Sequence, residues 1–192
     1  MAAMITGHFG LAAAVKSAEK PVPLWALMLA TVWLDILFTP LFLAGVETID
    51  DAPGTNGGYG DGIIHADYTH SLVGALIIAA VTGWLCARWW NRRAGVVIGA
   101  VVFSHWLLDL LVHRADMPIL PGNLGGLPRL GLGLWQYHAL TAVIEALLLL
   151  GGAALYWRAS RTTGATAGRS ALLTALIVVS GGVTLGLDLA GL

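Results

Sequence analysis

Five apolar runs, each long enough for a membrane-spanning helix, dominate this sequence of 192 residues. A helix needs about 20 apolar residues to cross the hydrocarbon core of a bilayer. Hydrophobic residues make up 57% of the chain and charged residues only 11%, whereas a soluble domain usually has about a quarter charged residues. The sequence therefore predicts an all-α integral membrane protein, a bundle of five transmembrane helices. The predicted spans are residues 23–46, 70–90, 94–113, 134–157 and 171–192.

A shorter apolar run, residues 4–15, precedes these five. It is too short to span a bilayer, and it lacks the basic start and the cleavage site of a secretory signal. We therefore expect a short N-terminal helix that is only partly inserted. Pro40 is expected to kink the first span. No polar stretch is long enough for a second domain, so residues 1–192 are predicted to form a single membrane-embedded helical domain.

Lysine and arginine residues alternate between the two predicted sides of the membrane. Eight of the ten lie before the first span, or in and next to the connections between the second and third spans and between the fourth and fifth. They are Lys16, Lys20, Arg88, Arg92, Arg93, Arg158, Arg161 and Arg169. The positive-inside rule predicts that these three segments, including the one before the first span, are cytoplasmic. Most of the acidic residues lie in the opposite connections, which are therefore predicted to be exoplasmic.

A stripe of polar side chains runs along the third span, in the segment SHWLLDLLVHR, residues 104–114. His105, Asp109 and His113 recur every four residues, so on a helix they point the same way. At about 1.5 Å per residue from Arg93, His105 lies roughly 18 Å deep and Asp109 roughly 24 Å deep. An ionised Asp at the centre of a bilayer costs about 2.5–3.5 kcal/mol, so the stripe needs a compensating partner.

Two further acids are predicted at similar depth, Asp35 at about 18 Å and Glu145 at about 19 Å. No Lys or Arg lies at that depth to pair with them. A bound cation stabilises ionised carboxylates and uses neutral imidazoles as ligands. Histidine and carboxylate ligands without cysteine suit Zn²⁺, Mn²⁺ or Fe²⁺. Two simpler explanations are open: His105 and Asp109 can form a hydrogen-bonded pair between helices, and Glu145 can be protonated.

Two motifs carry a resemblance to a known family. The segment HADYTHS (65–71), followed by SHWLLD (104–109), resembles the YdjM-like family of bacterial inner-membrane metal-dependent hydrolases. The resemblance covers residues 4–120 and includes a Gly-His segment near the N-terminus and an acid in the first span. It implies that the metal ligands are His8, Asp35, His65, His70, His105 and Asp109. Leu37 and Phe38 stand where the family has Asp and His, which argues against a full multinuclear site.

The order of these ligands is also distantly similar to that of zinc-dependent phospholipase C and P1 nuclease, which cleave phosphoesters. The resemblances imply a membrane-embedded metal-dependent hydrolase that acts from the exoplasmic side on a phosphoester or ester of a lipid-like substrate. Asp67 or Glu145 is predicted to act as the catalytic base, and Arg114 and His138 to bind the substrate. The expected cofactor is a divalent metal, Zn²⁺ first, with Mn²⁺ or Fe²⁺ as alternatives.

Two other classes of function use the same buried residues. Histidines on facing helices, such as His70, His105 and His138, could ligate a b-type haem. Asp35, Glu145 and the histidines could instead form the relay of an ion- or proton-coupled transport component. The expected partners are the lipid bilayer and a small or lipidic substrate. No basic cluster interleaved with aromatic residues points to nucleic acid, and the oligomeric state is left open.

Overall fold

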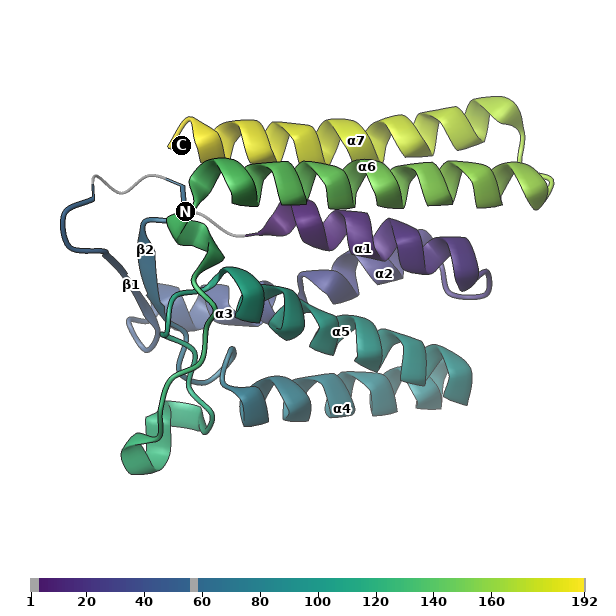
Figure 1. The fold of residues 1–192 in the computed structure, drawn as a ribbon. Helices are drawn as coiled ribbons and strands as arrows, with labels where there is room; N and C mark the ends of the chain where they lie inside the picture. Colours follow the sequence, from purple (N-terminus) through teal and green to yellow (C-terminus); the bar gives the residue numbers. More distant parts are fainter. Residues whose placement is uncertain (1–3, 56–58, 192) are drawn as a thin grey trace.

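The chain folds as a bundle of helices with a two-stranded hairpin at one end (Figure 1). The computed structural model describes residues 4–55 and 59–191; residues 56–58, and residue 192 of the predicted fifth span, lie outside the described residues. The helices are α1 (Ile5–Ala18), α2 (Leu24–Thr31), α3 (Trp33–Leu43), α4 (Leu72–Trp89), α5 (Arg92–Val112), α6 (His138–Thr162) and α7 (Ala167–Leu189). The remaining elements are strands β1 (Thr48–Asp51) and β2 (Gly62–His65) and the short 3₁₀ helices η1 (Pro121–Gly126) and η2 (Leu134–Gln136).

Four helices, α4, α5, α6 and α7, have the length and hydropathy of membrane spans. Helices α2 and α3 pass the same test together but are bent by 46° at the break between them. The described residues therefore contain four candidate spans, or five if the bent pair counts as one. Each candidate falls on one of the predicted apolar runs, which confirms a mostly helical fold. Long apolar helices of this kind indicate a multi-pass membrane protein.

The break in the predicted first span lies at a different place from the one expected. The prediction that Pro40 kinks this span is wrong. The chain bends at Val32 instead, and α3 continues through Pro40 to Leu43. Val32 has φ −114° and ψ 17°, outside regular α-helical geometry. The carbonyl of Thr31, next to the break, accepts a hydrogen bond from Nδ1 of His105 at 2.7 Å. A tertiary contact, which the sequence pattern does not show, stabilises the bend.

Helix α1 lies inside the bundle, against α2, α6 and α7 (Figure 1). The predicted short helix over residues 4–15 is confirmed as a helix, although it is longer, at 14 residues. Small residues allow a very close approach to α6. A side chain at Gly10 would collide with the backbone of Leu148, and one at Gly152 would collide with the backbone of Gly10. This packing helps to bury His8 completely, at 0% exposure.

The two ends of the bundle differ in charge and in structure. The α1–α2, α4–α5 and α6–α7 connections lie together at one end (Figure 1), and these connections and the adjoining helix ends carry the eight basic residues noted above. At the other end, β1 pairs antiparallel with β2, a hairpin that the sequence analysis did not predict. The α5–α6 connection, with η1 and η2, lies at that end as well (Figure 1). His70, which precedes α4, and His113, which follows α5, are therefore at the hairpin end.

Replacing Gly10 with Ala is expected to destabilise the fold, whereas replacing Gly151 with Ala is not. Both glycines are in helices, where Ala is the better helix former by about 1 kcal/mol. Gly10 faces the backbone of α6, while a side chain at Gly151 meets nothing within 4 Å. Overpacking costs about 1–3 kcal/mol, so Gly10→Ala should melt below wild type in detergent. Melting followed by circular dichroism tests this, and equal melting temperatures for the two variants would contradict the tight α1–α6 contact.

Candidate metal centre

Asp109 of α5 lies among four histidine side chains that come from different parts of the chain. Its Oδ2 atom is 3.0 Å from Nε2 of His105, 3.5 Å from Nε2 of His70 and 4.0 Å from Nε2 of His113. Its Oδ1 atom is 3.2 Å from Nε2 of His8. All five side chains are at most 5% exposed. The polar stripe of the third span therefore faces the interior of the bundle.

Asp35, in the first turn of α3, joins this cluster. Its Oδ1 atom is 3.5 Å from Nε2 of His70 and 3.4 Å from Nε2 of His105. The two imidazole nitrogens are themselves 3.2 Å apart. The side chain of Asp35 is 30% exposed, in contrast to the buried histidines. Asp35 is therefore the most exposed member of the cluster, although its Oδ2 atom is buried.

The distances between neighbouring donor atoms of Asp35, His70, His105 and Asp109 match the distances between neighbouring ligands of a metal ion. In a tetrahedral zinc site with bonds of about 2.0–2.1 Å, neighbouring ligand atoms are about 3.3 Å apart. Five distances among these four atoms lie between 3.0 and 3.5 Å. Two overlapping groups, His8–His105–Asp109 and Asp35–His70–His105, could each hold an ion. We call Asp35, His70, His105 and Asp109 the metal centre, with His8 beside it.

Hydrogen bonds on the far side of each ring direct Nε2 of His70 and His105 into the metal centre. Nδ1 of His105 donates to the Thr31 carbonyl. Nδ1 of His70 is 2.9 Å from Oγ1 of Thr69, and this hydroxyl is 2.9 Å from Oε2 of the buried Glu47. Because the hydroxyl has one proton and donates it to the carboxylate, it accepts from His70. Both rings are held in the tautomer that leaves Nε2 free to bind a metal.

The charges of the metal centre also fit a divalent cation. Asp35 and Asp109 together balance one such ion when the imidazoles are neutral. Among the described residues, neither carboxylate pairs with a Lys or Arg. Oδ2 of Asp35 and Nδ1 of His8 are buried and have no hydrogen-bond partner. Two imidazole lone pairs repel each other, so a 3.2 Å approach requires a proton or a metal ion between the rings.

Two predicted residues of the HADYTHS segment lie outside the metal centre. His65 of β2 has Nε2 3.1 Å from Oδ2 of Asp50, and its side chain is 37% exposed. Asp67 forms two hydrogen bonds with Arg129, at 2.8 and 3.1 Å. His65 is in neither of the groups that could hold an ion. Of this segment, the structure brings only His70 to the metal centre.

The two predicted substrate-binding residues contact the segment that follows the undescribed residues 56–58. Nη2 of Arg114 donates to the carbonyl of Gly60 at 3.2 Å. Nε2 of His138 is 3.4 Å from Oδ1 of Asp61, and the His138 side chain is 46% exposed. Both residues therefore lie at the hairpin end of the bundle, and neither is in a group that could hold an ion.

Glu145 of α6 is fully buried and links three elements of the chain. Its Oε2 atom accepts a hydrogen bond from the backbone N–H of Gly7 in α1 at 3.2 Å, and its Oε1 atom accepts one from the hydroxyl of Tyr59. Burial and the adjacent Glu145 carboxylate raise the pKa of Tyr59, so the phenol stays protonated and donates. Glu145 thus holds the first turn of α1, which contains His8, in place.

His113 was not among the site residues predicted from the sequence, although it belongs to the predicted stripe. Its Nδ1 atom is 2.9 Å from Oδ1 of Asp116, and its ring centroid is 4.5 Å from that of Trp135. The other oxygen of Asp116 accepts a hydrogen bond from the backbone of Ile64. Nε2 of His113 is left facing Asp109. The four-residue spacing between His113 and Asp109 is the signal that could have assigned it to the site.

Comparisons of the chain with protein-family models, with curated proteins and with solved structures give no match. The described residues bring together a buried set of His and Asp donors that could hold a metal ion.

Removing the hydroxyl of Thr69 is expected to weaken metal binding, whereas removing that of Ser104 is not. Thr69→Val breaks the link between Glu47 and Nδ1 of His70, and loss of such supporting hydrogen bonds lowers metal affinity about 10–100-fold. The hydroxyl of Ser104, in the same stretch of α5 as the stripe, donates to the carbonyl of Val101 instead. Zinc affinity measured by competition with a chromophoric chelator compares Thr69→Val with Ser104→Ala. Equal affinities would contradict the supporting role of Thr69.

Proposed function

We propose that this chain is a membrane-embedded metal-dependent hydrolase. The observation that carries the proposal is the set of closely spaced donor atoms from Asp35, His70, His105 and Asp109. Two imidazole nitrogens and two carboxylates suit Zn²⁺, with Mn²⁺ or Fe²⁺ as alternatives. A catalytic zinc site has three protein ligands and an open fourth position for water or substrate. Asp35, His70 and His105 form a group of three donors that could hold an ion, and such a group would leave the fourth position open.

The chain supplies a group that can move the proton in ester hydrolysis. A divalent ion held by these residues would act as a Lewis acid, activating water and polarising a phosphoryl or acyl oxygen. The attacking water loses a proton as its oxygen bonds to phosphorus or carbon, and the departing ester oxygen takes one up. Nε2 of His113 can accept and return this proton, while Asp116 holds Nδ1 and stabilises the imidazolium that forms. Asp67 and Glu145, the bases expected from the sequence, are already engaged in an ion pair and in hydrogen bonds.

The position of the metal centre supports a substrate class. The metal centre includes His70 and lies toward the hairpin end, away from the basic connections that the positive-inside rule assigns to the cytoplasm. We therefore propose a site on the exoplasmic side of a bacterial inner membrane, in keeping with the resemblance to YdjM-like hydrolases. A phosphoester or ester of a lipid-like molecule can approach such a site from the bilayer. Arg114 and His138 are proposed to contact the charged group or the leaving group.

In the described part of the chain, the geometry of the histidines favours neither of the alternative functions. The 3.2 Å between Nε2 of His70 and Nε2 of His105 leaves no space for the porphyrin of a b-type haem between these two rings. An ion or proton relay needs polar groups that continue from one side of the bundle to the other. The groups of the described residues that could hold an ion instead share His105 and lie together.

The purified protein is expected to contain a divalent metal that depends on the metal centre. His105→Ala and Asp109→Ala should each lose the ion, because each removes a donor atom. His65→Ala removes a histidine that the sequence assigns to the site but that the structure places beside Asp50, so this variant should keep the ion. Elemental analysis of detergent-purified protein compares the three variants. Metal retained in both His105→Ala and Asp109→Ala would rule the proposal out.

His113→Gln is expected to lower kcat about 10²–10⁴-fold without changing the metal content, because glutamine cannot accept the proton. The assay uses the metal-loaded protein with bis(p-nitrophenyl) phosphate and p-nitrophenyl butyrate as probes of phosphoester and ester hydrolysis. His65→Gln, outside the metal centre, is the matched control. A metal-loaded wild type that cleaves neither probe would count against a hydrolase. Full activity in His113→Gln would contradict only the proposed proton transfer by His113.

A further inference from the structure

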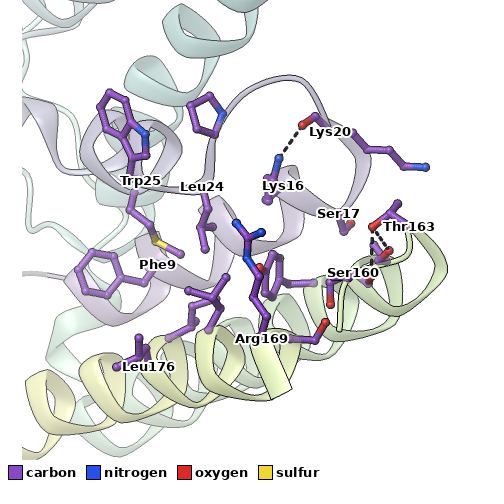
Figure 2. Close-up of a pocket in the computed structure, with 18 of the residues that line it drawn as sticks. Phe9, Lys16, Ser17, Lys20, Leu24, Trp25, Ser160, Thr163, Arg169 and Leu176 are labelled. Carbon is purple, nitrogen blue, oxygen red and sulfur yellow. Dashed lines mark hydrogen bonds between the residues drawn. The ribbon is translucent and has the colours of Figure 1, made fainter. Parts of the chain in front are cut away.

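A groove between α1, α2, α6 and α7 has features that neither the metal centre nor the proposed hydrolysis uses (Figure 2). Its volume is about 830 Å³, within the range of about 300–1,000 Å³ that is usual for small-molecule sites. Part of its wall is apolar. The side chains that form this apolar part are Phe9, Leu24, Met28, Leu173 and Ile177.

The other part of the groove is cationic. Lys16, Lys20 and Arg169 line it, and none of the described residues that line the groove is acidic. Neither Lys20 nor Arg169 has a carboxylate partner in the described part of the chain. Lys16 donates to the backbone carbonyl of Lys20 at 2.7 Å, which fixes its charge at the rim. Glu19, close by in sequence, is bound by Arg93, whose hydrogen bonds lower the pKa of that carboxyl and keep it ionised.

A hydroxyl without a hydrogen-bond partner follows Arg169 in the sequence. Ser170 lines the groove, is 1% exposed, and its Oγ atom is buried with no hydrogen-bond partner. Buried polar atoms without a partner are uncommon in folded proteins, so this hydroxyl is available to a ligand oxygen. Figure 2 shows Lys16 and Lys20 toward one end of the groove and Phe9 and Leu176 toward the other. The groove therefore matches a ligand that is anionic at one end and apolar at the other.

We propose that the groove binds an anionic phospholipid. The phosphate is bound by Arg169 and Ser170, with Lys16 and Lys20 adding positive charge at the same end of the groove, and an acyl chain lies along Phe9 and Ile177. A free phosphate leaves the apolar part empty, and a neutral lipid leaves two cations without a counter-charge. The cations lie at the end of the bundle opposite the hairpin, whereas the metal centre lies toward the hairpin. A lipid in the groove is therefore bound away from the metal centre and is not hydrolysed there. This inference is independent of the metal centre.

Native mass spectrometry of the full chain in detergent tests the proposal, with dioleoyl phosphatidylglycerol and dioleoyl phosphatidylcholine as probes. Phosphatidylglycerol should bind about tenfold more tightly or better, because each cation near a lipid phosphate contributes about 1 kcal/mol. The double variant Lys20→Gln/Arg169→Gln should remove this preference. The control Arg158→Gln/Arg161→Gln removes two charges from the same end of the bundle, but neither residue lines the groove, so the preference should persist.

A second arm tests the apolar part of the groove. Leu173→Trp should fill it and lower phosphatidylglycerol affinity about tenfold, with the metal content and melting temperature as checks that the fold is kept. Millimolar inorganic phosphate should not displace the lipid. Three results would overturn the proposal. They are equal binding of the two lipids, an equal loss of the phosphatidylglycerol preference in both charge variants, and displacement of the lipid by phosphate. A dimer that Leu173→Trp dissociates would also overturn it, because the groove would then be an interface between copies of the chain.

Discussion

A carboxylate buried inside a bundle of apolar helices must be compensated, and Asp109 is where this requirement is most severe. Its side chain is 5% exposed, and four imidazoles lie within 4.0 Å of it. An uncompensated charge in such a place would destabilise the fold by several kcal/mol or more. The negative charge of Asp109 must therefore be balanced, either by protons on the surrounding histidines or by a metal ion that these histidines bind. The elements that bring them, α1, the start of α4, and α5, are arranged around this one side chain.

The packing of the bundle and the chemistry of the metal centre depend on the same contacts. The bend at Val32 places the Thr31 carbonyl where it accepts from His105, and this bond sets the tautomer of the ring. The close approach of α1 to α6 at Gly10 brings His8 beside Asp109. A change that loosens the helices would therefore also misplace donor atoms. Because the same helix contacts hold the histidines around Asp109, the packed bundle keeps this buried acid compensated.

The two ends of the molecule have different chemistry. The hairpin end holds acids and imidazoles that could hold a metal ion, whereas at the basic end Lys20 and Arg169 have no carboxylate partner among the described residues. Both sets would be unfavourable in a bilayer without their counter-charges. A metal ion at one end and a lipid phosphate at the other would each supply part of the counter-charge at its own site.

The sequence by itself determined the helices and the stripe of His105, Asp109 and His113, because helical periodicity and apolar length are local properties of the chain. It also indicated that Asp35 and His70 belong with them, through the resemblance and the cost of burying charge. Only the tertiary structure decided the rest. Glu47 and Thr69 support His70 through contacts that lie outside any helical repeat, and His65 lies apart although its motif suggested otherwise. These outcomes depend on which distant segments meet, and spacing along the chain carries no information about that.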